Sequence, residues 1–368
     1  MPEKGKISIR QLTILVMLIT IGDSILVLPS TSVSFAKQDT WISGLIGLAV
    51  GLLAVYMFSV VGNLHPKLTL VQSSQKILGT WLGSLVAVIF LFYPIITNVA
   101  FFREIGDFMT TEMMPETPSQ AIQILFACIV VFGVRLGLEV IARTGEIFLP
   151  FFILLFFLLV IFLFPQAELE KLQPILENGI KPVIHGSLSV IAFPFLELVV
   201  FLMIVPYINQ PQHLKKGLLQ GALLGGMVIF ILIVISILVL GADQTSRALY
   251  PSYSLARRVT IGKFFERVEA MLALMWLLTI FMKSAFYFYV FNLGLAQLLK
   301  LKGYRMLTLP TALLMIVLAP IIAPDVTYYN KVIGEYWPYF DMTYGILLPL
   351  LLLVGYFIRK VFTRSTKK

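Results

Sequence analysis

Charged residues are scarce in this 368-residue chain. Asp, Glu, Lys and Arg together make up 13% of it, whereas 59% of its residues are hydrophobic and the mean hydropathy is +0.93. Soluble domains carry about 25% charged residues, so this composition excludes an ordinary soluble protein and predicts many membrane crossings. No linker or low-complexity stretch divides the chain, and we therefore expect a single permease-like membrane domain over residues 1–368.

Cysteine and histidine are scarce as well. The one cysteine, Cys128, excludes an intrachain disulfide, and the three histidines are far apart in the sequence. The chain also has no phosphate-binding loop, Cys–His cluster or nucleophile elbow. We therefore expect no metal site, no cofactor and no enzymatic activity. The net charge of +9 resides mainly in loops and at the C-terminus, which favours contact with anionic lipid headgroups of the bilayer over nucleic acid.

Ten apolar segments are each long enough to cross about 30 Å of hydrocarbon. An even number places both termini on one side of the membrane. Of the 28 basic residues, 17 fall on the side of the N-terminus and 10 on the other, so both termini are predicted to be cytoplasmic. The approximate segments are 9–33, 41–62, 79–103, 118–138, 146–165, 183–207, 217–241, 266–297, 305–323 and 339–359.

A basic cluster lies between the seventh and eighth segments. We expect the loop that carries it to be partly folded. Its members are Arg247, Arg257, Arg258, Lys263 and Arg267.

The first and sixth segments are interrupted near their middles. Gly22, Asp23 and Ser24 follow one another in the first segment, and all three residue types are poor helix formers. In the sixth segment Pro194 removes a backbone donor, and Glu197 lies three residues later. Either feature alone would be read as an ordinary kink. Together, each beside an acidic residue, they favour a central binding site.

The two interruptions begin two halves of nearly equal length. Each half has five segments, approximately residues 9–165 and 183–359. This arrangement predicts an all-α membrane protein with a five-plus-five inverted repeat, in which the first and sixth helices are broken and a ligand binds between the breaks.

Three charged residues are predicted at membrane depth, namely Asp23, Glu197 and Lys283. A lysine at the centre of a span costs roughly 3 kcal/mol on insertion scales, so it needs a partner or a function. The three charges could form a structural ion network, or they could bind a zwitterionic or hydroxylated ligand, a cation or a proton. In folds of this type the eighth span runs beside the first. Lys283 would then stand where other proteins bind sodium, and we expect no sodium dependence.

The candidate substrate-binding residues surround the two interruptions. For the aromatic members, simple packing is the alternative interpretation. The candidates are Gly22, Asp23, Ser24, Ile25, Tyr93, Phe193, Pro194, Phe195, Glu197, Lys283 and Tyr287.

A charged motif covers residues 137–150, between the fourth and fifth segments. Glu139 and Arg143 are four residues apart, and Arg143 and Glu146 are three apart, so a helix would carry them as a ladder of opposite charges. The motif resembles the signature of spore germination receptor B subunits, the endospore germination permease family of the amino acid–polyamine–organocation superfamily. Further matches cover nearly the whole chain: residues 172–182, 193–195 with Glu197, 250–257, 264–269 and 281–283.

The resemblance implies a ten-helix, LeuT-like fold in the inner membrane of a bacterial spore. It implies assembly with a germination receptor A subunit and a lipoprotein C subunit. The B subunit would recognise a small nutrient, such as an amino acid or a sugar, and signal to these partners. The segment with Glu139, Arg143 and Glu146 would be a structural or signalling loop.

Two residues depart from the family pattern. Leu196 stands where relatives usually have glycine, which would narrow or reshape the break in the sixth helix. Asp23 lies where amino acid permeases usually have small neutral residues, and it would repel a substrate carboxylate. Asp23 could instead pair with Lys283, accept a ligand ammonium group or hydrogen-bond a sugar.

The leading hypothesis is therefore a germinant-sensing receptor subunit. A proton-coupled amino acid transporter, with Glu197 or Asp23 as the proton carrier, is the alternative. A third possibility is a conduit for ions or water that its partner subunits gate.

Overall fold

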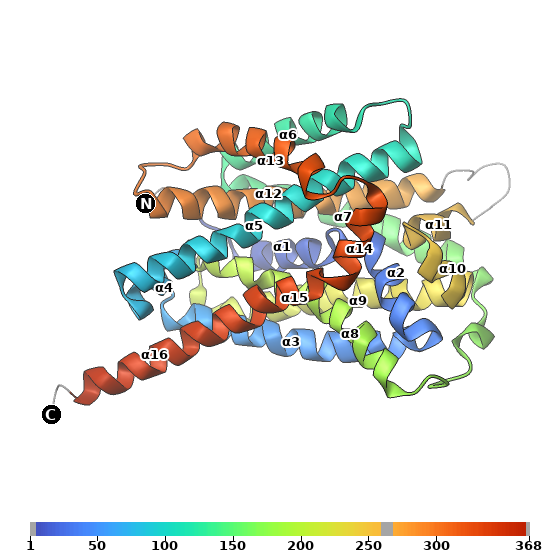
Figure 1. Cartoon of the computed structure of the whole chain (residues 1–368), viewed down its shortest axis with the longest axis horizontal. Helices are drawn as coiled ribbons and strands as arrows, with labels where there is room; N and C mark the ends of the chain where they lie inside the picture. Colours follow the sequence, from blue (N-terminus) through green and yellow to red (C-terminus); the bar gives the residue numbers. More distant parts are fainter. Residues whose placement is uncertain (1–4, 259–267, 366–368) are drawn as a thin grey trace.

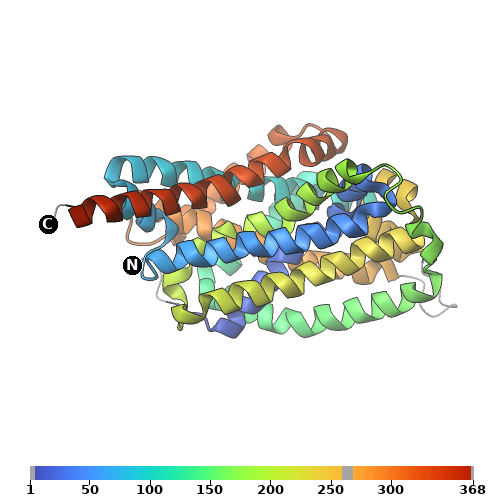
Figure 2. The same ribbon diagram turned by 90° about the horizontal axis from the view of Figure 1, so that it is seen from below.

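The protein is a bundle of long helices whose axes are roughly parallel (Figure 1). The computed structural model describes residues 5–258 and 268–365. The first helix begins, and the last helix ends, at the left end of the bundle in two perpendicular views (Figures 1 and 2). An even number of crossings produces this arrangement.

The ten predicted spans are all present. In chain order they are α1 (Ile9–Ile21) with α2 (Ser24–Ala36), α3 (Thr40–Leu64), α5 (Thr80–Phe108), α6 (Ser119–Leu136), α7 (Leu138–Leu163), α8 (Ile180–Phe195) with the 3-10 helix η5 (Leu196–Met203), α9 (Leu214–Leu240), α12 (Val268–Leu298), α13 (Thr308–Ile322), and α15 (Trp337–Met342) with the π-helical turn η9 (Thr343–Leu347) and α16 (Leu348–Ser365).

Shorter elements connect the spans. The α-helices among them are α4 (Leu70–Leu78), α10 (Ala242–Arg247), α11 (Pro251–Arg257) and α14 (Val326–Glu335). The remaining turns are η1 (Lys37–Asp39), the π-helical η2 (Met109–Met113), η3 (Phe164–Gln166), η4 (Leu169–Leu172), η6 (Val205–Tyr207), η7 (Pro211–His213) and η8 (Arg305–Leu307).

Length and composition support a membrane location for these helices. Within the described residues, nine continuous helical stretches are long and apolar enough to cross a membrane, and α1 is a shorter apolar helix. One of the nine combines α2 and α3, because only the turn η1 separates them. The first span therefore consists of the short helix α1 and of α2, and α2 forms one long stretch with the second span, α3.

Helix α1 lies inside the bundle. It packs against α9, α7, α12 and α8. Every residue from Leu12 to Ile21 except Thr13 is buried, as expected for a helix that is apolar all round. Its start is fixed by a capping box in which Ser8 and Gln11 exchange hydrogen bonds of 2.9 and 3.1 Å.

Glycines on α9 allow α1 to approach closely. A Cβ atom on Gly221 would lie 2.5 Å from the carbonyl oxygen of Thr13, and one on Gly225 would lie 2.6 Å from the Cβ of Thr20. Small residues permit this close contact between membrane helices, which have no hydrophobic driving force to hold them together in lipid. The first interrupted span is thus held tightly along its first half.

Two connecting segments differ in how well they were predicted. The loop with the basic cluster is partly folded, as expected: it contains α10 and α11, while Lys263 and Arg267 lie outside the described residues. The segment with Glu139, Arg143 and Glu146, which was named a structural or signalling loop, is helical, as the spacing of its charges predicted. These residues lie in the first turns of α7, because the chain turns at Gly137 (φ 102°) and becomes helical at Leu138.

Candidate functional site

The first interruption lies between α1 and α2, at Gly22 and Asp23. Gly22 has a φ of +29°, which L side chains rarely adopt. A Cβ at this position would lie 2.3 Å from the Cδ of Lys283 and 2.9 Å from the carbonyl oxygen of Ile19. The freed carbonyl of Gly22 accepts a hydrogen bond from Oγ1 of Thr279 at 3.0 Å. Glycine is thus required both by the backbone angle and by the close approach of Lys283.

The sixth span changes helix type rather than separating. Helix α8 ends at Phe195, and the chain continues as the 3-10 helix η5 from Leu196. Pro194 lacks the N–H that would continue the α-helical ladder, and a 3-10 stretch within a long helix often marks a hinge. Both spans were expected to be broken. The first is broken at Gly22, whereas the sixth stays helical and changes from an α-helix to the tighter 3-10 helix.

Lys283 joins the two interruptions. It forms ion pairs with Asp23 and with Glu197, so the three charges predicted at membrane depth do meet. The exposed fractions of the three side chains are 0% for Lys283, 8% for Asp23 and 1% for Glu197. The ammonium nitrogen also lies 5.1 Å from the ring centre of Phe101 on α5. Two carboxylates and an aromatic face thus surround the lysine.

Two tyrosines extend this group of Asp23, Glu197 and Lys283, which we call the ion cluster. The hydroxyl of Tyr287 donates to the backbone carbonyl of Glu197 at 2.8 Å. Tyr93 donates to Oδ1 of Asp341 at 2.8 Å, and its ring centre is 6.3 Å from that of Tyr287. It also stacks on Tyr344 of η9 with the ring centres 4.7 Å apart. Both tyrosines named from the sequence therefore lie at the cluster and connect it to the tenth span.

Sequence reasoning missed two buried carboxyl groups, Glu104 and Asp341. Their exposed fractions are 2% and 0%. Glu104 follows Arg103, which marked the predicted end of the third span, but α5 continues to Phe108. Asp341 was assigned to the start of the tenth span without a role. The signal available for both was an acidic residue next to aromatic or apolar neighbours in a segment that could still be helical.

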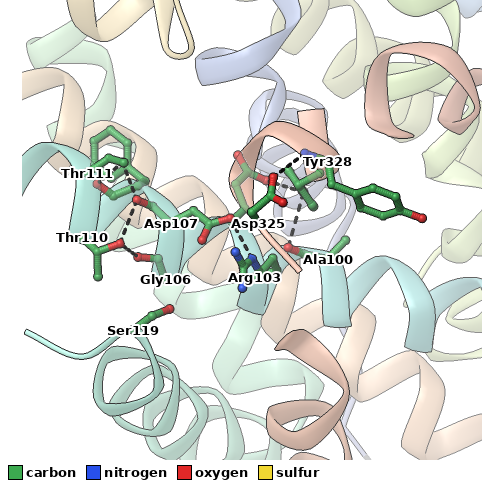
Figure 3. A network of polar contacts seen from close by, with 12 residues as sticks. Ala100, Arg103, Gly106, Asp107, Thr110, Thr111, Ser119, Asp325 and Tyr328 are labelled. Atoms are coloured by element: carbon green, nitrogen blue, oxygen red, sulfur yellow. Dashed lines mark hydrogen bonds and ion pairs between the residues drawn. The ribbon is translucent and has the colours of Figure 1, made fainter. Parts of the chain in front are cut away.

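Polar contacts surround the C-terminal end of α5, where α14 contacts it (Figure 3). Nε of Arg103 pairs with Oδ2 of Asp107 at 2.8 Å, one turn further along α5. Asp325 caps α14 by accepting from the backbone N–H of Tyr328 at 2.8 Å. The hydroxyl of Tyr329 donates to Glu104 at 3.5 Å. Glu104 therefore accepts a hydrogen bond from α14, and it lies on α5, the helix that also carries Tyr93.

Some buried polar atoms at the cluster have no hydrogen-bond partner among the described residues. They include Oγ of Ser24, Oε1 of Glu104, Oε1 of Glu197 and Oδ2 of Asp341. Buried polar groups are nearly always satisfied in folded proteins, so unsatisfied ones call for an explanation such as a ligand or an ion. No group of three or more His, Cys, Asp or Glu side chains in the described part of the chain is arranged to hold a metal ion.

The ring of Phe195 points away from the ion cluster, and for Ile25, Phe193 and Pro194 the contacts are with the backbone or within the packed core. The ring of Phe195 packs where α3 and α9 have glycines, because a Cβ on Gly51 would lie 2.2 Å from it and one on Gly226 would lie 2.7 Å from it. Ile25 contributes a backbone carbonyl, which accepts from Ser252 of α11 at 2.7 Å. Phe193 and Pro194 are buried within α8.

The charge ladder of α7 is present only in part. Arg143 pairs with Glu139 at 2.6 Å on an exposed surface. Glu146 instead accepts from Nε2 of Gln11 at 3.0 Å and lies 3.9 Å from Nε of Arg10. This side chain therefore ties the start of α7 to the start of α1, at the end of the bundle rather than at the ion cluster.

The arrangement of spans is that of LeuT-type transporters. The chain superposes on the structure of MhsT in complex with L-phenylalanine with a TM-score of 0.67 and 12% identity, covering 94% of this chain and 97% of that one. It superposes on Mhp1, a nucleobase-cation-symport-1 family transporter, with a TM-score of 0.61 and 12% identity, covering 90% and 75%. At this identity the likeness concerns the fold alone, and it confirms the predicted fold class.

The chain belongs to the spore germination protein family, which matches residues 6–326. It is 28% identical over 356 residues to spore germination protein KB of Bacillus subtilis (strain 168), covering 96% of this chain and 95% of the relative. Spore germination protein YndE of the same organism is 27% identical over 304 residues, covering 81% and 82%. Spore germination protein XB of Bacillus anthracis is 25% identical over 292 residues, covering 79% and 81%. The predicted family is confirmed.

Proposed function

We propose that this protein is the nutrient-sensing B subunit of a spore germination receptor. It binds a small nutrient, such as an amino acid or a sugar, between the interruptions of the first and sixth spans. One observation carries the proposal: Lys283 forms ion pairs with both Asp23 and Glu197 in the interior of the bundle. A fully paired ion network adds little stability over apolar packing, so its presence at the meeting point of two irregular helices favours a functional role.

A ligand acts by competing for these pairs. A nutrient with an ammonium or hydroxyl group can hydrogen-bond Asp23 or Glu197, and a carboxylate can pair with Lys283. Each such contact weakens the link between the first and sixth spans and changes the balance between two arrangements of the bundle. The ligand's differential affinity for those arrangements is the signal that reaches the partner subunits.

We also propose a membrane location, a topology and partner subunits for the protein. The chain acts as one permease-like domain with two inverted repeats, in the inner membrane of the spore and with both termini in the cytoplasm. Its partners are the receptor A subunit and the lipoprotein C subunit. Membership of the spore germination protein family supports this assignment.

Replacement of Glu197 tests the proposal directly. The Glu197→Gln change removes the charge that pairs with Lys283 while it keeps the shape of the side chain. We expect spores with this variant to lose their response to the nutrient, measured as release of dipicolinic acid against a panel of amino acids, sugars and potassium salts. The matched control is Glu116→Gln, an exposed residue outside the spans, which should respond normally. An unchanged response of the Glu197 variant, with normal accumulation of the subunit, would remove Glu197 from the site.

A proton-coupled amino acid transporter remains the second candidate. It is favoured by an excess of acidic groups: Asp23, Glu197, Glu104 and Asp341 are buried near one buried cation, Lys283, among the described residues. An unpaired buried carboxylate is costly and favours protonation, so such a cluster can carry a proton. Uptake of a labelled amino acid by proteoliposomes, driven by an imposed pH gradient, would support this function. Germination that requires the gene without any such uptake would favour the sensor.

A further inference from the structure

A cationic groove lies at the end of the bundle where α1 and α9 begin. Its volume is about 540 Å³. Arg10, His213, Lys216 and Gln210 form its polar wall, and Ile14 and Leu149 contribute apolar surface. The groove is separate from the ion cluster, which lies beyond the second half of α1.

Backbone pairing builds this groove. The N–H of Ile7 donates to the carbonyl of Tyr207 at 2.9 Å, and the N–H of Asn209 donates to the carbonyl of Ile7 at 3.0 Å. This short pairing fixes the residues before α1 beside the residues before α9. Arg10, in the first turn of α1, is thereby held beside Gln210 in the groove wall. The groove is a feature of the fold and not a chance meeting of long side chains.

Two cations of the groove are available to a ligand. Lys216 is exposed, and no carboxylate pairs with it in the described parts of the chain. Arg10 is 81% exposed and approaches Glu146 only to 3.9 Å, while Glu146 accepts a closer bond from Gln11. The neighbouring Lys215 is directed elsewhere, with its nitrogen 4.5 Å from the ring centre of Tyr56 on α3.

An exposed apolar stripe continues from the groove along α9. Gln220 lines the groove, and Leu223, Leu224 and Met227 lie three, four and seven residues later, so they occupy the same face of the helix. Their exposed fractions are 43%, 49% and 40%. A polar, positively charged recess at the end of a span is thus followed by an apolar surface within the span.

We propose that this groove binds the phosphate of an anionic glycerophospholipid, whose acyl chains lie along the apolar stripe of α9. The position of the groove at the beginning of two spans corresponds to the depth of lipid headgroups, and the exposed cations Arg10 and Lys216 complement a phosphate. A bound lipid would contact the starts of α1 and α9 together. The lipid would therefore stabilise the end of the first span that the Ile7 pairing and Glu146 also hold.

The test measures lipid binding to the full-length protein in detergent by native mass spectrometry. Phosphatidylglycerol should bind in preference to phosphatidylcholine. The double variant Arg10→Gln, Lys216→Gln should bind phosphatidylglycerol about thirtyfold more weakly, because two basic residues near the surface are lost and each contributes about 1 kcal/mol. The matched control is Lys302→Gln, Arg305→Gln, which removes one exposed lysine and one exposed arginine from another loop and should bind normally. The conservative variant Lys216→Arg should also bind normally.

Three results would overturn the proposal. The first is an equal loss of phosphatidylglycerol binding in the groove variant and in the control, with both melting normally. The second is full displacement of the lipid by millimolar inorganic phosphate, which would indicate a site for a free anion. The third is a lack of lipid preference combined with binding of a hexaglutamate peptide that depends on Arg10 and Lys216, which would indicate docking of an acidic protein segment. None of these results depends on the nutrient response.

Discussion

The interruptions of the first and sixth spans are held in different ways. The first is a true break, in which Gly22 makes room for the stem of Lys283 and Asp23 pairs with its ammonium group. The sixth remains helical as η5 and is positioned by apolar contacts. A Cβ on Gly345 of η9 would lie 2.6 Å from the Cβ of Leu196, and the ring of Phe195 fits against α3 and α9. The sixth span supplies Glu197 to the ion cluster, and the apolar packing of Phe195 and Leu196 on either side of its interruption positions its backbone.

This difference matters for the nutrient-sensing function that we propose. In that proposal, a ligand that alters the charges around Lys283 acts on the first span through Asp23 and on the sixth through Glu197. Movement of the sixth span is also limited by the packing of its Phe195 against α3 and α9 and of its Leu196 against η9. We therefore expect substitutions of the charged residues around Lys283 to alter the nutrient response, and substitutions of the apolar residues that pack the sixth span to alter stability.

The largest effect is expected from Gly22→Ala. The new Cβ would overlap with Lys283 and with the carbonyl of Ile19, and the backbone oxygen cannot move aside as a flexible side chain can. The positive φ angle adds strain for any L side chain. We expect little folded protein to accumulate, measured by immunoblot of the membrane fraction.

Gly303→Ala is the matched control for this change, because nothing lies within 4 Å of a Cβ at that position. It should accumulate as the unmodified protein does. Normal accumulation and normal melting of the Gly22 variant would show that the first span is not closed around Lys283, and the contrast between the two interruptions would be lost.

Replacement of Lys283 by methionine should have the next largest effect. The change leaves Asp23 and Glu197 buried without a partner, and breaking a buried ion pair in this way costs about 3–5 kcal/mol. We expect a lower melting temperature in detergent and a loss of nutrient response in spores. Loss of response should exceed loss of subunit abundance.

A double variant separates structure from function at this position. Adding Asp23→Asn to Lys283→Met removes one of the two unpaired charges and should restore part of the melting temperature. The nutrient response should stay absent. If the response returns together with the melting temperature, Lys283 is a structural residue and the first break has no special role in sensing.

The sequence was sufficient to predict most of the fold. Ten apolar segments and the two irregular positions within them predicted the LeuT-type arrangement, because hydrocarbon thickness and backbone hydrogen bonding leave few alternatives. It was also sufficient to predict that Asp23, Glu197 and Lys283 meet, since each is too costly to leave alone in a span.

The rest depends on side-chain direction, which hydropathy does not report. Phe195 was assigned to the site because it is next to Pro194, yet its ring points toward Gly51 and Gly226. Asp341 was overlooked because its partner Tyr93 is 248 residues away in the sequence. The fifth span was predicted to begin at residue 146, because the charges before it lower the hydropathy, yet α7 already begins at Leu138.

The smallest of the three effects is expected from Leu196→Ala, at the sixth interruption. Leu196 is fully buried in a small apolar cluster with Ile191 and Ala192, and truncation of a buried leucine costs about 2–5 kcal/mol in protein cores. We expect a lower melting temperature, with a value near the lower end of that range because η9 can move toward the space. The nutrient concentration that gives half-maximal germination should not change, since no charge around Lys283 is altered. A shift of that concentration without a change in melting temperature would mean that the apolar packing of the sixth span takes part in ligand recognition as directly as the charges around Lys283.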